Sequence, residues 1–241
     1  MRQDPETKKQ VLSDSVRRIL GTLHHFYNWM LRSGYIKSDP TIAVKLPSIK
    51  KPEAKNLSDE FVKQILSAIT QTSLPERNLA LIAVLSHGLK PGEPSNLNVG
   101  DYDGFLLHIQ FAKHDNKSFV QLDEWAQQML NNYLEWRIDE GETLKDDSPL
   151  FLSHSRRNAG ERMSYDAVRK LVEKIRIETG FYFYAQQFRH TFAANLVIEG
   201  IKLSHVMKIT RHRSVNNFRR YTKIADKKNQ SLRNLTGYSP P

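Results

Sequence analysis

Most of this chain carries apolar residues at helical spacing, and only one short stretch alternates in the manner of β-strands. The alternating runs occupy residues 105–111 and 118–122, and a polar turn containing lysines joins them. Helices are expected over the other apolar patterns, at about 11–33, from the Ser58 cap to Ile69, and at 75–88, 123–140, 164–179, 187–199, 203–210 and 214–224. This pattern predicts a mainly α fold with a small antiparallel β-sheet (α+β), in which the alternating runs form a hairpin.

A stretch rich in proline and lysine divides the chain. Residues 39–55 contain three prolines and lack a clear hydrophobic period, which is typical of an interdomain linker. We therefore expect a helical N-terminal region over residues 1–46, a linker over 47–55, and a larger domain with a C-terminal tail over 56–241.

The composition excludes several classes of protein. The chain has no cysteine, so it holds neither a disulfide framework nor a cysteine-based zinc site. Its longest purely apolar run, residues 79–85, is seven residues long, whereas a membrane span needs about 20. The first nine residues are polar and do not resemble a secretory signal. We expect a soluble, intracellular protein of the cytoplasm that does not bind membranes.

Positive charge is concentrated at both ends of the chain, whose formal net charge is +10. Residues 1–55 carry a net charge of +6 and residues 201–241 carry +9, which leaves −5 for the residues between them. Cations gathered in this way favour a polyanionic partner, and nucleic acid is the simplest candidate. A ribosomal surface or an acidic membrane is the alternative.

One tyrosine in the basic C-terminal part has the surroundings of a nucleophile. Tyr221 directly follows Arg220 and lies nine residues after His212. A phenol has a pKa of about 10 and is a weak nucleophile at neutral pH. Cations and hydrogen-bond donors that favour the phenolate make it competent for covalent catalysis. The natural electrophile for such a site is a phosphodiester.

The chain resembles the tyrosine recombinases, the phage-integrase family of DNA strand-exchange enzymes, over about residues 10–235. The elements that carry the resemblance occur in the family's order: a Gly-Leu-basic-x-x-Glu segment at 88–93 with an Asn-Leu-x-x-x-Asp tail at 96–101, a lysine in the hairpin turn (Lys113), an Arg-His pair that opens a helix at 189–190, and His212 nine residues before Tyr221. Each element is weak alone, but their joint order and spacing are specific. The resemblance implies a tyrosine recombinase catalytic domain over 56–241, preceded by a partial helical core-binding, DNA-binding region over 1–46.

The resemblance also implies a reaction that needs no metal, nucleotide or other cofactor. Tyr221 attacks a DNA phosphate and forms a 3′-phosphotyrosyl link, and a 5′-hydroxyl reverses the step. Arg189 meets the charge that develops on the phosphate, His212 hydrogen-bonds a phosphate oxygen, and Lys113 protonates the leaving oxygen. The alternative for Lys113 is a surface lysine that contacts phosphate, and for His212 it is a structural core histidine. The structural interpretation is preferred for His190.

Two catalytic positions depart from the family pattern. Lys90 stands where the family has its first arginine, and Gln186 stands where a histidine precedes the second arginine by three residues. Lysine keeps the charge but lacks the planar fork of a guanidinium group, and glutamine cannot take or give a proton. Lys90 and Gln186 are nevertheless candidate catalytic residues. The candidate DNA-binding residues are Arg211, Arg213, Arg219 and Arg220.

These features predict a site-specific DNA recombinase or integrase, of the kind found on mobile elements. Its partner is double-stranded DNA, on which it self-associates as a dimer or tetramer. Two alternatives stay open: a catalytically impaired relative that binds DNA as an accessory protein, and a type IB topoisomerase-like enzyme with the same nucleophile. Retention of Tyr221 and Lys113 favours an enzyme over a binding protein, because DNA binding alone needs neither residue.

Overall fold

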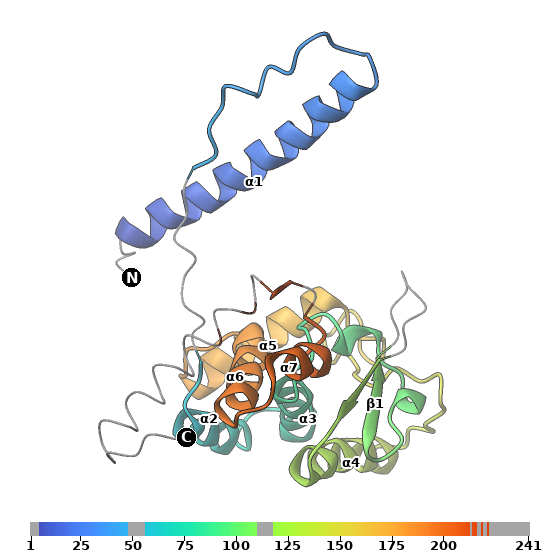
Figure 1. Ribbon diagram of the computed structural model, residues 1–241. Helices are drawn as coiled ribbons and strands as arrows, with labels where there is room; N and C mark the ends of the chain where they lie inside the picture. The colour runs from blue at the N-terminus through green and yellow to red at the C-terminus, as the bar shows by residue number, and fades with distance from the viewer. Residues whose placement is uncertain are drawn as a thin grey trace, which may run out of the picture. The chain divides into compact units, whose positions relative to one another are not determined.

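The computed structural model describes residues 5–47, 56–109, 118–212, 214, 215, 218 and 221, with side chains from residue 15 onward. The chain forms two compact units, Met1–Glu53 and Ala54–Pro241. In the described ranges the first unit holds a single α-helix, and the second holds the other helices and the sheet (Figure 1).

The N-terminal unit is built on one long helix, α1 (Pro5–Arg32). This helix begins six residues before the predicted start. The prediction began later because residues 5–10 are polar and carry no apolar period. A proline nevertheless suits a first helical turn, and lysine and glutamine favour helix. The helix is followed by Gly34, whose φ of 76° is typical of a glycine at a helix end. Large apolar side chains such as Phe26 and Trp29 stay exposed on it.

The described part of the C-terminal unit is mostly helical. Its α-helices are α2 (Asp59–Ile69), α3 (Pro75–Ser86), α4 (Glu124–Asp139), α5 (Tyr165–Thr179), α6 (Ala185–Ile198) and α7 (Leu203–Ile209), joined by the short 3-10 helices η1 (Pro94–Asn96) and η2 (Val99–Asp101). The α-helices agree with the predicted ranges to within two residues at each end. Three of these helices begin at a side-chain cap, which accepts a hydrogen bond from the backbone N–H three residues later. The caps of α2, α4 and α5 are Ser58, Asp123 and Ser164, with distances from nitrogen to side-chain oxygen of 3.2, 2.8 and 3.2 Å.

The predicted hairpin forms a two-stranded antiparallel sheet within the described residues. Strand β1 (Leu106–Ile109) pairs with β2 (Ser118–Gln121), and Leu107 lies opposite Val120. Both of these side chains are buried while their neighbours along each strand are less so, as the period of two requires. The turn of the hairpin, residues 110–117, lies outside the described residues.

Helix α3 is the centre of the C-terminal unit. From Leu79 to Leu85 it is apolar on all sides, and every residue from Ala80 to Leu85 is buried. Helices α4 and α6 pack against it. The prediction of a mainly α fold with a small antiparallel sheet is confirmed. Within the described ranges, no helix combines the length and the apolar character that crossing a bilayer demands.

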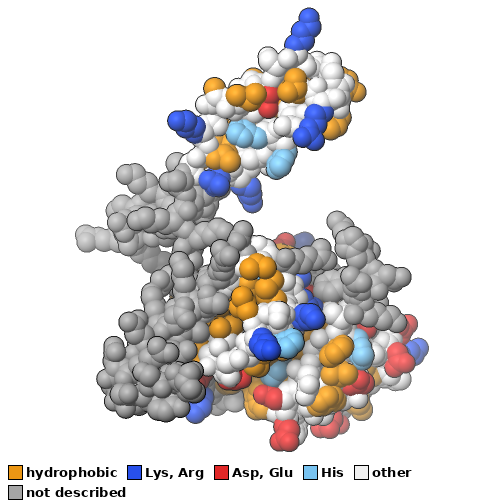
Figure 2. All heavy atoms as spheres, in the orientation of Figure 1, with side chains coloured by type: hydrophobic (Ala, Val, Ile, Leu, Met, Phe, Trp, Pro, Cys, Tyr) orange, Lys and Arg blue, Asp and Glu red, His pale blue; other side chains and the backbone are white. Residues whose placement is uncertain are grey.

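Charged side chains are unevenly spread over the face shown in Figure 2. Acidic side chains gather at the lower edge, where Figure 1 places α4, and basic side chains lie along the N-terminal helix. Helix α4 carries three exposed acidic residues, Glu124, Glu135 and Asp139. The signs of charge on these two helices match those that the sequence assigns to the N-terminal residues and to the middle of the chain; most of the basic C-terminal residues lie outside the described residues.

Candidate active site

Arg189 lies in the first half of α6 and is almost fully buried, with 2% of its surface exposed. Its two terminal nitrogens donate hydrogen bonds to the backbone carbonyls of Gly88 and Thr210. Burial, followed by repulsion from Arg211, lowers the pKa of Arg189 to about 10, against the opposing effects of Glu93 and Tyr221. The group therefore stays charged at neutral pH and is held in place by two carbonyls of distant segments.

The carbonyl of Gly88 reaches Arg189 because the chain turns sharply after α3. Gly88 has a φ of 83°, and a Cβ atom built on it would lie 2.7 Å from Cδ1 of Phe192. A left-handed backbone and a neighbour this close both require glycine. The Gly-Leu-basic-x-x-Glu segment thus has a structural reason for its first residue.

Lys90 and Glu93 follow this turn and form a local pair. The backbone N–H of Lys90 donates to Oε2 of Glu93 at 2.7 Å, and its Nζ lies 3.6 Å from Oε1. The lysine side chain is 45% exposed, whereas that of Glu93 is 9% exposed. Burial lowers the pKa of Lys90, Glu93 raises it, and the guanidinium groups of Arg189 and Arg211 lower it further.

Arg211 comes to the same carboxylate from the turn after α7. Its Nη2 donates to Oε2 of Glu93 at 2.6 Å and to the carbonyl of Gly88 at 3.1 Å. Its φ is 54°, a left-handed conformation that side chains other than glycine rarely adopt. Gly88 therefore accepts hydrogen bonds from two guanidinium groups, those of Arg189 and Arg211.

Tyr221 is fully buried in a small apolar cluster with Ala193, Ala194, Val206 and Phe218. Its hydroxyl lies 2.5 Å from Nδ1 of His190. Its ring also packs on Phe218 and His212, with centroids 4.8 and 5.7 Å away. The predicted nucleophile therefore has an imidazole at its hydroxyl and another at its ring edge.

Thr210 joins the tyrosine cluster to the cations. Its hydroxyl lies 2.6 Å from Nδ1 of His212, and its carbonyl accepts the hydrogen bond from Arg189. Tyr221 is close enough to Arg189 to raise the pKa of that guanidinium. Four residues predicted from sequence, Lys90, Arg189, His212 and Tyr221, are thus connected through shared contacts.

The remaining predicted residues are less involved or lie elsewhere. Gln186 is half-buried on the first turn of α6, three residues before Arg189, and forms no side-chain hydrogen bond within the part of the chain that the structure describes. The predicted site residues that lie outside the described residues are Lys113, Arg213, Arg219 and Arg220.

Sequence reasoning missed two contributors to this site. His190, for which the structural interpretation is preferred, contacts the Tyr221 hydroxyl, and its position beside Arg189 on a helix is the available signal. No residue pattern could have indicated the role of Thr210, because the group that binds Arg189 is its backbone carbonyl. In the described ranges, no cluster of three or more histidine or acidic side chains is arranged to hold a metal ion.

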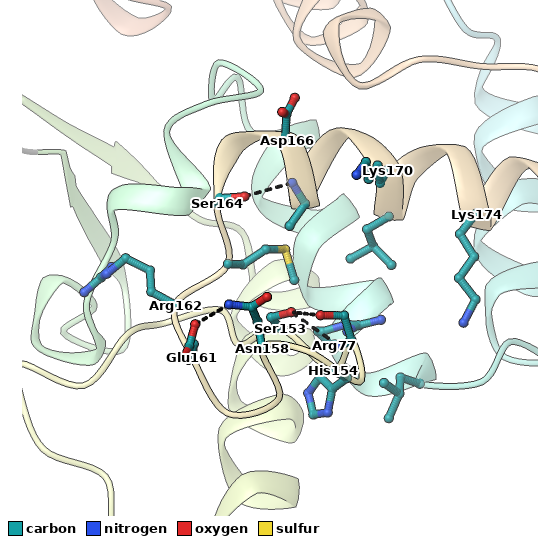
Figure 3. Close-up of a pocket in the computed structure, with 15 residues that line it drawn as sticks. Arg77, Ser153, His154, Asn158, Glu161, Arg162, Ser164, Asp166, Lys170 and Lys174 are labelled. Carbon is teal, nitrogen blue, oxygen red and sulfur yellow. Dashed lines mark hydrogen bonds between the residues drawn. The ribbon is translucent and has the colours of Figure 1, made fainter.

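A separate hollow of about 550 Å³ is lined by none of the predicted residues. Figure 3 shows Lys170 and Lys174 on α5 facing it from one side, with Arg77 and His154 from other elements. Burial lowers the pKa of Arg77 and also, together with nearby arginines, that of His154. Glu161 and Asp166 also line the hollow, together with Leu74, Ser153, Ser155, Asn158, Arg162, Met163, Ser164, Ala167 and Leu171.

Comparison with known proteins identifies related sequences. The sequence model of the phage integrase family matches residues 55–228. Tyrosine recombinase XerC of Oceanobacillus iheyensis is 29% identical over 218 residues, which cover 87% of this chain and 70% of the relative. Tyrosine recombinase XerA of Pyrococcus furiosus is 26% identical over 184 residues, which cover 75% of this chain and 61% of that protein.

Solved structures share the fold. The crystal structure of XerA recombinase matches with a TM-score of 0.64 at 20% identity, covering 92% of this chain and 84% of that one. XerH site-specific recombinase bound to its difH substrate matches with a TM-score of 0.58 at 26% identity, covering 75% and 53%. A lambda integrase dimer bound to a COC′ core site matches with a TM-score of 0.61 at 17% identity, covering 87% and 59%.

Proposed function

The chain belongs to the phage integrase family, and we propose that it is a site-specific tyrosine recombinase that cleaves and rejoins double-stranded DNA through Tyr221. The observation that carries the proposal is the setting of this tyrosine. Its hydroxyl meets His190, its ring meets His212, and Thr210 links His212 to the buried Arg189. A phenol beside two imidazoles and a fixed guanidinium group has the surroundings of an activated nucleophile.

The proposed reaction balances without a cofactor. The Tyr221 oxygen attacks the phosphorus of the scissile phosphodiester, and the bond between phosphorus and the 5′-oxygen breaks. The phenol proton passes to a base, for which Nδ1 of His190 is within reach. The leaving oxygen takes a proton from Lys113. A 5′-hydroxyl of the same or another duplex then attacks the phosphotyrosine and returns its proton to Lys113, and the released Tyr221 oxygen regains its proton from His190.

Charge stabilisation is assigned to Arg189 and Lys90. Arg189 is held by two backbone carbonyls, so its orientation needs no rearrangement as negative charge develops on the phosphate. Donors fixed in this way contribute about 10²- to 10³-fold each to the rate in comparable sites. Lys90 is the exposed cation next to Arg189, which suits a group that meets DNA from solvent.

The reaction also requires a movement of the nucleophile. Tyr221 has no exposed surface and is packed among apolar side chains. A phosphate reaches its oxygen only when Tyr221 separates from Ala193, Ala194 and Val206. We assign this opening to DNA binding, because a conformational step that completes a site on substrate binding is a common way to gate it.

The N-terminal unit is assigned a role in holding DNA. Residues 1–46 would form a partial core-binding region that contacts DNA, and residues 56–241 the catalytic domain that cleaves it. The net charge of +6 over residues 1–55 supports this assignment. The likeness to XerH bound to its substrate and to a DNA-bound lambda integrase dimer supports DNA as the partner and self-association on it.

The test uses a nicked suicide duplex. A binding site is first selected from a random duplex library, and a nick is placed so that the fragment carrying the 5′-hydroxyl diffuses away after cleavage. The protein is expected to form a covalent adduct that survives a denaturing gel. Tyr221→Phe is the matched control, since it removes one oxygen and is expected to bind the duplex without forming the adduct.

The other outcomes distinguish the remaining functions. Tight binding without an adduct would favour a catalytically impaired DNA-binding protein. Relaxation of a supercoiled plasmid that lacks the selected site, with the same dependence on Tyr221, would favour a topoisomerase-like enzyme.

A further inference from the structure

We propose that Arg211 is a catalytic residue of this site, binding the scissile phosphate and supplying the guanidinium group that Lys90 does not. The inference rests on the proposed function and deepens it. Arg211 shares two acceptors with the cations already described: the Gly88 carbonyl with Arg189, and the Glu93 carboxylate with Lys90.

The first supporting observation is that Arg211 has unused donors. A guanidinium group carries five N–H bonds. Nη2 serves both Gly88 and Glu93, while Nε and Nη1 are buried and have no hydrogen-bond partner among the described residues. Only 8% of the Arg211 side chain is exposed. Buried charged donors without partners are unfavourable, and a phosphate oxygen would satisfy them.

The second observation is an excess of positive charge. Lys90, Arg189 and Arg211 all interact with one carboxylate, that of Glu93, so these contacts bring three cations to one anion among the described residues. Arg211 lowers the pKa of both Arg189 and Lys90, which is the sign of repulsion between like charges. A bound phosphate relieves this repulsion, so the cluster is suited to an anion.

The third observation is the backbone of Arg211. Among the described residues, it is the one residue other than glycine with a positive φ. Strained backbone of this kind concentrates at functional sites. Glycine would form the same turn without strain, so a turn alone does not account for an arginine there.

Access to these donors requires the same opening as Tyr221. Both side chains are covered by the protein, and both residues follow α7 in the sequence. We assign the exposure of Arg211, like that of Tyr221, to DNA binding. Lys90 then needs to supply only a point charge, because Arg211 brings the guanidinium group.

The test compares Arg211→Gly with the wild type on the suicide duplex at saturating DNA. Glycine suits the φ of this position, so the variant removes the guanidinium group without straining the turn. We expect cleavage to slow by about 10²-fold. Arg156→Gly makes the same change at an exposed loop position and is expected to leave cleavage within about twofold of the wild type.

A second substrate separates contact with the phosphate from a positioning role. A methylphosphonate at the scissile position has no negative charge. If Arg211 meets that charge, Arg211→Gly slows cleavage of the phosphodiester strongly and of the methylphosphonate by less than about threefold. Equal losses on both substrates, or no loss on either, would overturn the proposal.

Lys90 provides a third comparison. The effect of Lys90→Arg on cleavage is expected to be smaller in the wild type than in the Arg211→Gly background, because the wild type already has a guanidinium group from Arg211. In the Arg211→Gly background the same change is expected to restore cleavage by about tenfold or more. Equal effects of Lys90→Arg in the two backgrounds would contradict the replacement of one residue by the other.

If the wild type forms no adduct, the proposed function is wrong, but anion binding by Arg211 can still be tested by a binding measurement. Inorganic phosphate is titrated while the melting temperature is followed. The melting temperature of the wild type is expected to rise with phosphate concentration, and that of Arg211→Gly to rise much less. Equal responses of the two proteins would overturn the assignment of an anion site to Arg211.

Discussion

Gly88→Ala tests how the turn after α3 holds the cations of the site. Alanine at this position meets two separate penalties. The φ of 83° is left-handed, which costs about 1–2 kcal/mol for a residue with a Cβ atom. The added Cβ would also lie 2.7 Å from Cδ1 of Phe192, an overpacked contact that costs about 1–3 kcal/mol. The expected loss in the free energy of unfolding is therefore about 2–5 kcal/mol.

Thermal denaturation of the full chain, followed by circular dichroism, measures this loss. For a domain of this size, each kcal/mol lowers the melting temperature by about 2–4 °C. The matched control is Gly180→Ala at the end of α5, where φ is 73° and nothing lies within 4 Å of the added Cβ. It is expected to lose only the backbone part, about 1–2 kcal/mol.

A second-site change isolates the steric part. Phe192→Leu shortens the side chain that the new Cβ meets. The double variant Gly88→Ala/Phe192→Leu is therefore expected to lose less free energy of unfolding than the sum of the losses of the two single variants. A Gly88→Ala protein no less stable than Gly180→Ala, or strictly additive losses in the double variant, would refute the reasoning.

Three further predictions concern the core, the alkaline pH limit and the DNA interface. Arg137 is 1% exposed, and it donates to both carboxylate oxygens of Glu142 and to two backbone carbonyls, so Arg137→Ala is expected to destabilise the protein by about 3–5 kcal/mol in urea unfolding. Arg169→Ala, which breaks an exposed ion pair, is expected to lose less than about 1 kcal/mol, and equal losses would contradict the prediction. The pKa of Lys90 lies below its ordinary value, so the charge of this lysine is present below that pKa and is lost as pH rises through it. The rate of cleavage at subsaturating DNA should therefore decline on the alkaline side. Lys90→Arg should move this decline to higher pH. Affinity for duplex DNA should fall about tenfold or more between about 50 and 200 mM salt, as filter binding would measure, and an affinity independent of salt would argue against DNA as the partner.

Local patterns were sufficient to predict most of the helices. In α2, α4 and α5 a capping side chain precedes an apolar period, so start and face are both encoded within a few residues. The first turns of α1 lack that information, because their sequence is polar and has no apolar period to detect. The hairpin was predictable for the converse reason, since its strands alternate where everything around them repeats at helical spacing.

The residues of the site were predictable as types but not as contacts. The resemblance to a family identified Arg189, His212 and Tyr221 by their order in the chain. The links between them run through Thr210 and the carbonyl of Gly88, and hydrogen bonds to backbone atoms leave no residue pattern. Long-range packing was equally hidden, because the contact of Tyr221 with His190 depends on how the end of the chain folds against α6.

The left-handed turn at Arg211 shows the same limit at a single position. The residue was predicted to bind DNA because it lies in a basic stretch. Its conformation and its contact with Glu93 follow from a segment more than a hundred residues earlier in the chain, which no local rule includes. A position that breaks a local rule in this way is where a functional constraint is to be expected.

The most direct measurement is the identity of the residue that carries DNA in the covalent adduct. The chain has nine tyrosines, so an adduct alone does not establish the nucleophile. Nuclease digestion followed by peptide mapping in a mass spectrometer would locate the attached nucleotide. We predict a single modified peptide, with a nucleotide 3′-phosphate on Tyr221, and no modification in Tyr221→Phe. A nucleotide on any other residue, or an adduct that persists in Tyr221→Phe, would contradict the assignment of Tyr221 as the nucleophile.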